Sequence, residues 1–137
     1  MTILPTHTCF DDALDYIGEV VKTDPDWAID RLTLVHAICL APAGPTKDRP
    51  FAHAWVEEKR DDCTTAVIQS GLLEGDKIYY VWSPEQLAEV LRPQDVTRYT
   101  VEQAWRENER TCHYGPWKPD YAALCGGGHT FEDAAAS

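Results

Sequence analysis

Positive charge is scarce in this sequence. Lys and Arg together number 12, against 23 Asp and Glu, and the formal net charge is −11. The basic residues are scattered along the chain and form no stripe. Because nucleic-acid phosphates repel a surface of this sign, we expect no nucleic-acid partner.

Long hydrophobic runs are also missing. No apolar segment approaches the roughly 18 residues that a membrane-spanning helix needs. The first residues, MTILPTHTCFDD, lack the basic region and the apolar stretch of a secretory signal. We therefore expect no membrane association and a cytoplasmic location.

Closely spaced cysteine pairs are the third absence. The chain has five cysteines and no CxxC pair. The cysteines are Cys9, Cys39, Cys63, Cys112 and Cys125. An odd number without an export signal predicts free thiols. A zinc site made of Cys112, His113, Cys125 and His129 is an alternative, but this spacing matches no compact zinc motif. We expect no metal and no cofactor.

What is present predicts an α+β fold. A chain of 137 residues fits one domain, which we expect to span 1–125, with a flexible tail at 126–137. Helical periodicity indicates a helix at 9–21, and Asp24-Pro25 begins a turn or a short helix. Strands are expected at 32–40, 51–58, 63–70 and 77–82, and helices at 84–91 and 101–110. Consecutive strands without alternating helices favour an antiparallel sheet of four to five strands, covered by the N-terminal helix and followed by C-terminal helices.

Helix starts carry capping signals. Thr8 followed by Asp11 has the spacing of a capping box at the first helix, with Asp in place of Glu. Ser83 with Gln86, and Thr100 with Gln103, give the same spacing at the two later helices.

Cys9 is the first candidate for chemistry. It would occupy the first position of its helix, where backbone N–H groups and the helix dipole favour a thiolate. Asp11 and Asp12 oppose this effect, because neighbouring negative charge raises a thiol pKa.

His53 is the second candidate, in the segment PFAHAWVEE at 50–58. On a strand its side chain shares one face with Phe51 and Trp55. If the following turn centres near Lys59 and Arg60, His53 lies opposite Ala66 or Val67. In the second register Gln69 lies diagonal to His53 on the same face, where its amide oxygen could accept from the imidazole.

These segments resemble a known superfamily. TCFDDA, LVHAICL, FAHAWVEE and AVIQSG are similar to the core of the transglutaminase-like and papain-like cysteine peptidases, and HAWVE is similar to a stretch in bacterial lasso-peptide peptidases. The resemblance implies Cys9 as nucleophile, His53 as general base and a third residue near Gln69, where many members have aspartate. Ser70 is the second choice for that third residue.

Two functions follow from this pattern. The first is a thiol hydrolase or acyltransferase that uses Cys9, His53 and Gln69 on a peptide or protein. The second is a non-enzymatic acidic protein that keeps a papain-like shell and binds a protein partner. In the second case His53 is a packed core residue, the role that we also expect for His36. The segment CHYGPW is expected to plug the sheet edge, with a role in lining a site as the alternative.

Overall fold

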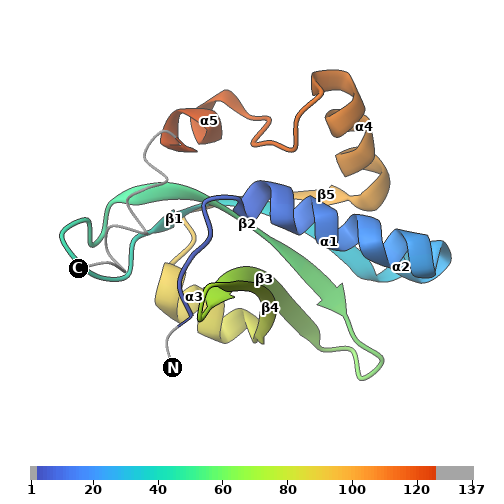
Figure 1. Ribbon diagram of the computed structural model, residues 1–137, viewed down its shortest axis with the longest axis horizontal. Helices are drawn as coiled ribbons and strands as arrows, with labels where there is room; N and C mark the ends of the chain where they lie inside the picture. The colour runs from blue at the N-terminus through green and yellow to red at the C-terminus, as the bar shows by residue number, and fades with distance from the viewer. Residues whose placement is uncertain (1–2, 126–137) are drawn as a thin grey trace.

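Five antiparallel strands form one sheet, in the order β4-β3-β2-β1-β5, with helices on both faces (Figure 1). The computed structural model describes residues 3–125. Its elements are α1 (Cys9–Thr23), α2 (Pro25–Arg31), β1 (Leu32–Leu40), β2 (Pro50–Lys59), β3 (Thr65–Leu73), β4 (Asp76–Trp82), α3 (Pro84–Leu91), β5 (Asp95–Thr100), α4 (Val101–Thr111) and α5 (Pro119–Cys125). This order confirms the predicted α+β fold, with an N-terminal helix, an antiparallel sheet and further helices.

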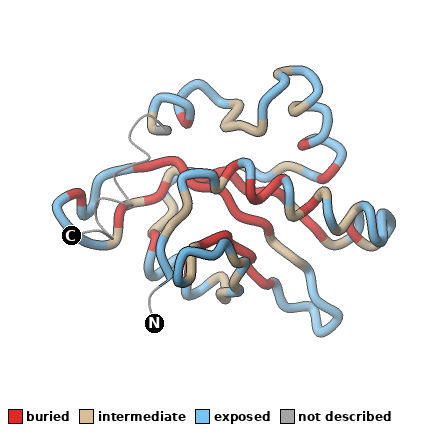
Figure 2. Tube along the Cα trace, viewed as in Figure 1, coloured by how far each residue is buried: buried red, intermediate tan, exposed pale blue. Residues whose placement is uncertain are grey.

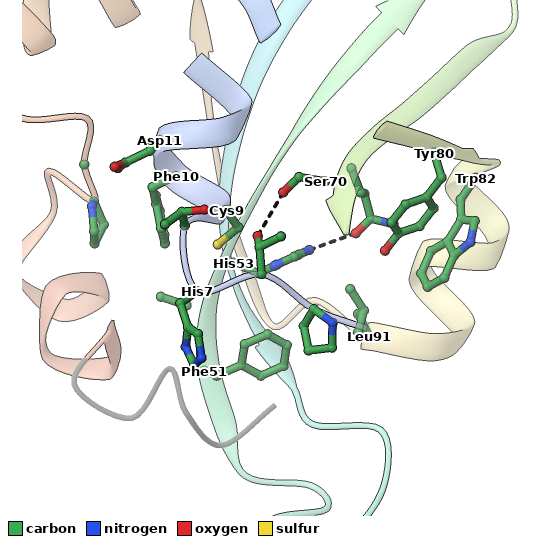
Figure 3. A pocket seen from close by; sticks show the side chains of 17 residues that line it. His7, Cys9, Phe10, Asp11, Phe51, His53, Ser70, Tyr80, Trp82 and Leu91 are labelled. Atoms are coloured by element: carbon green, nitrogen blue, oxygen red, sulfur yellow. Dashed lines mark hydrogen bonds between the residues drawn. The ribbon is translucent and has the colours of Figure 1, made fainter. Parts of the chain in front are cut away.

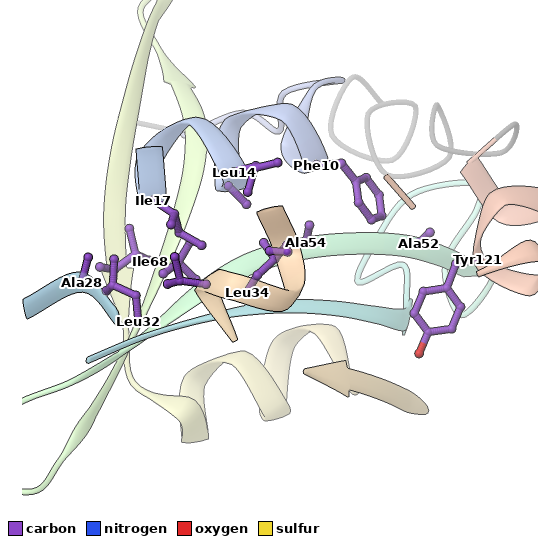
Figure 4. Close-up of a cluster of buried hydrophobic side chains, with 14 residues drawn as sticks. Phe10, Leu14, Ile17, Ala28, Leu32, Leu34, Ala52, Ala54, Ile68 and Tyr121 are labelled. Atoms are coloured by element: carbon purple, nitrogen blue, oxygen red, sulfur yellow. The ribbon is translucent and has the colours of Figure 1, made fainter. Parts of the chain in front are cut away.

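The sheet separates two hydrophobic layers. Side chains of α1 pack on one face together with residues of α2, α4 and α5 (Figure 4). The other face packs against α3 through Leu87 and Leu91. Burial is therefore highest along β1, β2 and the adjoining part of β3, as the tube in Figure 2 shows.

Phe51 and Trp55 lie on the α3 side of the sheet, not under α1. Both side chains are buried, at 2% and 1% exposure. The two rings pack with Leu87 and Leu91 rather than with the first helix, which was expected to cover the sheet. Since strand side chains alternate, His53 belongs to this same α3-facing side of β2.

The start of α1 differs from the prediction. Phe10, Leu14 and Ile17 are buried at the expected helical spacing. The Thr8 side chain, however, makes no cap hydrogen bond. It donates instead to Asp12 Oδ2 at 2.8 Å, four residues along the chain. The two later capping boxes, Ser83 with Gln86 and Thr100 with Gln103, are both present.

The hairpin between β2 and β3 turns later than expected. The loop runs from Arg60 to Thr64 and contains Cys63 with φ 67°, so its centre lies near Asp62. The ladder joins Val56 to Ile68 and Lys59 to Thr65, and it does not extend to His53. The predicted partners Ala66 and Val67 face Glu58 and Glu57 instead.

Beyond this ladder the two strands separate. From Pro50 to Trp55, β2 pairs only with β1, and from Gln69 to Leu73, β3 pairs with β4. We call the space between these diverging halves the fork. The N-terminal segment enters the fork, where Leu4 forms a bridge with Leu72. Because the sheet is open there, groups from its two faces can meet.

Two elements escaped the sequence analysis. β5 pairs with β1 at one edge of the sheet, and α5 begins at Pro119. The predicted tail at 126–137 lies outside the described residues.

Candidate functional site

A cavity of about 290 Å³ occupies the fork. Its walls come from the N-terminal segment, the start of α1, β2, β3, β4, the end of α3 and the loop before α5. Among its lining residues are Cys9, His53, Gln69 and Ser70, so all of the sequence-predicted site residues border one space (Figure 3). The split sheet explains this meeting, because it opens the α3 side of β2 to the first turn of α1.

His53 is nearly enclosed, at 8% exposure. Its ring lies between Phe51 and Trp55, with centroid separations of 5.8 Å to each. Burial lowers the pKa of His53 below its ordinary value, and the hydrogen bond with Gln69 offsets part of that effect. The imidazole is therefore neutral near pH 7, the protonation state of a general base.

Gln69 fixes the orientation of the His53 ring. His53 Nε2 lies 2.8 Å from Gln69 Oε1, and both side chains are buried. An amide oxygen only accepts, so Nε2 carries the proton and Nδ1 remains as the acceptor. This contact confirms the predicted hydrogen bond. Ser70, the second choice, bonds elsewhere: its hydroxyl lies 3.1 Å from that of Thr6.

Cys9 is the first residue of α1 and is half-buried at the cavity wall. A second thiol, Cys39 on β1, lies fully buried nearby. Burial, and secondarily Cys9, raise the pKa of Cys39 to about 12. Cys39 is thus held as a neutral thiol, which leaves Cys9 as the sulfur that borders the cavity.

Asp12 is a buried carboxylate that the sequence analysis did not single out. It is 3% exposed and accepts hydrogen bonds from Thr6, Thr8 and Lys77, at 2.9, 2.8 and 3.1 Å. Lys77 comes from β4, so Asp12 joins α1 to both the N-terminal segment and the edge strand. The i, i+4 spacing of Thr8 and Asp12 was the only local signal; Thr6 and Lys77 reach Asp12 through tertiary structure.

One end of the cavity is apolar and aromatic. Tyr80 and Trp82 of β4 line it together with Leu91 of α3 and Phe51 of β2. Burial raises the pKa of Tyr80 to about 12, so its phenol stays neutral. These residues were not predicted, because their meeting depends on where β3 and β4 lie after the fork.

The segment CHYGPW packs as an aromatic plug and also reaches the cavity. Trp117 lies with its ring centroid 5.0 Å from those of both His36 and Tyr99. Gly115 and Pro116 line the cavity. A side chain at Gly115 would meet the His36 ring, since an added Cβ would lie 2.7 Å from Cε1. The two alternatives for this segment are therefore both present.

Metal coordination has no support within residues 3–125, where no group of three or more His, Cys, Asp or Glu side chains could hold an ion. Of the zinc alternative, His129 and the Cys125 side chain lie outside the described residues. None of the helices in the described part of the chain has the length and apolarity to cross a membrane.

Comparisons with known proteins yield no relative: no family model, no curated protein and no solved structure matches this chain.

Proposed function

We propose that this chain is a thiol hydrolase or acyltransferase of the papain-like or transglutaminase-like kind, acting on an amide or ester carbonyl of a peptide or protein. Cys9 is the nucleophile, His53 the general base and Gln69 the positioning residue. The observation that carries the proposal is the 2.8 Å bond from His53 Nε2 to Gln69 Oε1 inside a cavity that Cys9 also borders. A nucleophile, a base and a group that orients the base then share one site.

The proposed reaction begins with transfer of the Cys9 thiol proton to His53 Nδ1 as the sulfur attacks the carbonyl carbon. The tetrahedral intermediate collapses when the leaving amine or alcohol takes that proton from the imidazolium. A thioester on Cys9 and a neutral His53 remain. Water then attacks the thioester in a hydrolase, or an amine in an acyltransferase, with His53 again accepting and returning the proton.

The surroundings of His53 and Cys9 support the proposed roles of these two residues. A neutral His53 suits a base, while the Gln69 amide holds the tautomer whose Nδ1 is free to accept. The α1 N-terminus favours negative charge as it develops at the sulfur and at the carbonyl oxygen. Cys39, Cys63 and Cys112 form no disulfide among the described residues, which fits the reducing cytoplasm that we propose as its location.

Alkylation tests the proposal without a known substrate. The native protein would be treated with limiting iodoacetamide near pH 7.5, and each cysteine followed by peptide mapping. We expect Cys9 to react at least tenfold faster than Cys63 and Cys112, although these two thiols are exposed and Cys9 is half-buried. Cys39 should react slowest, because burial keeps it protonated.

Equal or slower reaction of Cys9 would contradict the enzyme proposal. The cavity would then support the second function, a papain-like shell that binds a protein partner through its acidic and aromatic surface.

A further inference from the structure

The N-terminal segment, residues 3–8, crosses the fork above His53, and we call it the strap. Leu4 pairs with Leu72 through two backbone hydrogen bonds, of 2.9 and 2.8 Å. Pro5, Thr6 and the two following residues line the cavity. In Figure 3 the strap ribbon runs beside the His53 ring, and both line the same cavity.

The strap is held mainly by polar contacts at its surface. None of its six residues is buried, and the apolar side chains of Ile3 and Leu4 are 40% and 43% exposed. Side-chain bonds from Thr6 to Asp12 and Ser70, and from Thr8 to Asp12, add to the Leu4 bridge. Segments with few buried apolar contacts open at low free-energy cost.

What lies beneath is held much more firmly. His53 and Gln69 are 8% and 1% exposed and belong to the two interior strands that border the fork. Gly71 of β3 lets the strap come close: a Cβ added there would lie 2.4 Å from Ile3 Cγ2 and 3.2 Å from the Leu4 carbonyl oxygen. The loosely attached strap therefore packs closely against β3, whose interior residues are buried.

We propose that the strap is a displaceable cover that regulates access to the cavity, lying where an extended peptide would pair with the Leu72 edge of β3. When the strap lifts, the backbone groups of Leu72 become available for strand pairing, and the cavity with its His53 ring opens to solvent. The inference rests on the proposed function only in treating this cavity as the peptide site.

Carbethoxylation of histidine by diethyl pyrocarbonate measures the opening directly, independent of Cys9 reactivity. The rate at His53 would be followed by peptide mapping in the full chain. His113, exposed on the loop before α5, serves as the accessible reference, and the fully buried His36 as the inaccessible one. Thr6→Val keeps the shape of the residue but removes its bonds to Asp12 and Ser70. We expect it to raise the His53 rate about tenfold, because each lost hydrogen bond favours opening, and to leave the reference rates unchanged.

A disulfide lock provides the reverse test. Leu4 and Leu72 form a hydrogen-bonded antiparallel pair, whose Cα atoms lie about 5.5 Å apart, within the range of a disulfide. The substitutions Leu4→Cys and Leu72→Cys would be combined with Cys63→Ser and Cys112→Ser, which remove the two exposed thiols. We expect oxidation to lower the His53 rate at least tenfold relative to the same protein reduced, with His113 unaffected.

Equal His53 rates in the oxidised and reduced forms would overturn the strap proposal, even if Thr6→Val failed to fold. The two proposals fail separately. If the disulfide protects His53 but Cys9 alkylates slowly, the strap proposal stands and the thiol-enzyme proposal fails. If Cys9 alkylates fast but the disulfide does not change the His53 rate, the thiol-enzyme proposal stands and the strap proposal fails.

Discussion

Two histidines are buried in neighbouring strands of one sheet, but on opposite faces and in different surroundings. His36 of β1 pairs in register with Ala54, and His53 of β2 with Ala37. Burial lowers the pKa of both, that of His36 to about 3. His36 is packed among the rings of Phe10, Tyr99 and Trp117, and within the described residues neither of its ring nitrogens has a hydrogen-bond partner.

His53, unlike His36, has a polar hydrogen-bond partner and borders a cavity. The bond to Gln69 fixes which nitrogen carries the proton, and the cavity gives the ring a route to Cys9 and to a ligand. Burial alone therefore does not identify a functional histidine. The hydrogen-bonded orienting group and the shared space are what separate the candidate base from the packed ring.

The largest effect expected from this comparison is on acid stability. Unfolded His36 has a pKa near 6.5 and folded His36 one of about 3, so between these values the unfolded state binds a proton that the folded state does not. Stability is therefore full above pH 6.5 and falls as the pH drops towards 3. Between pH 7 and pH 4 this histidine should cost about 3 kcal/mol, at 1.36 kcal/mol per pH unit below 6.5.

His36→Leu should remove that loss. Urea unfolding at pH 7 and pH 4 would give the change in the free energy of unfolding for each protein, and in the difference between the two proteins the carboxylates and His53 cancel. Identical pH dependence in the two proteins would mean that His36 is hydrated in the folded state.

His53→Ala should instead act on reactivity. Removing the base should lower the rate of Cys9 alkylation about 10²-fold, at the low end of what general bases contribute. His36→Leu should leave that rate within twofold, since neither ring nitrogen of His36 has a hydrogen-bond partner among the described residues. Rates would be measured with iodoacetamide at pH 7.5. A similar loss in both variants would show that the effect comes from the packing of the sheet and not from proton transfer.

Local signals predicted much of this fold. The helical spacing of Phe10, Leu14 and Ile17 predicted α1, and the pairs Ser83–Gln86 and Thr100–Gln103 located the starts of α3 and α4. The hairpin register was wrong because the turn has no Asn-Gly or Asp-Gly signal; its left-handed residue is Cys63.

The bond between His53 and Gln69 was nevertheless predicted, for a physical reason. Continuing the observed ladder would put Gly71, rather than Val67, opposite His53, a slip of four residues. An even slip keeps every side chain on its face, so Gln69 stays diagonal to His53.

Features that depend on distant contacts could not be predicted. Thr6 meets Ser70 across 64 residues, and Asp12 meets Lys77 across 65. β5 was missed because it is an edge strand with half-exposed and exposed residues only, so it lacks the apolar alternation of a covered strand.

Gln69→Leu tests the orienting group alone. It leaves the buried Nε2–H of His53 without an acceptor, which should cost about 1–3 kcal/mol of stability. The freed ring should also lose its fixed tautomer, and Cys9 alkylation should slow roughly tenfold, less than with His53→Ala, because the base itself is still present. Thermal unfolding and the alkylation rate would be measured on the same protein sample. Unchanged alkylation with lowered stability would leave Gln69 a structural residue only.

Gln69→Glu should give the smallest change in the rate of Cys9 alkylation, and it tests directly whether His53 accepts the Cys9 proton. A glutamate keeps the acceptor oxygen for His53 Nε2–H, so the ring stays oriented and Cys9 should alkylate within about threefold of the native rate at pH 7.5. The new carboxylate favours the imidazolium and raises the pKa of His53. In the native protein burial lowers the pKa of His53, so protonation of His53 should slow Cys9 alkylation only at acid pH. In the variant this slowing should begin at a higher pH. A pH profile that does not move would mean that His53 does not accept the Cys9 proton, and the proposed thiol chemistry would then be wrong.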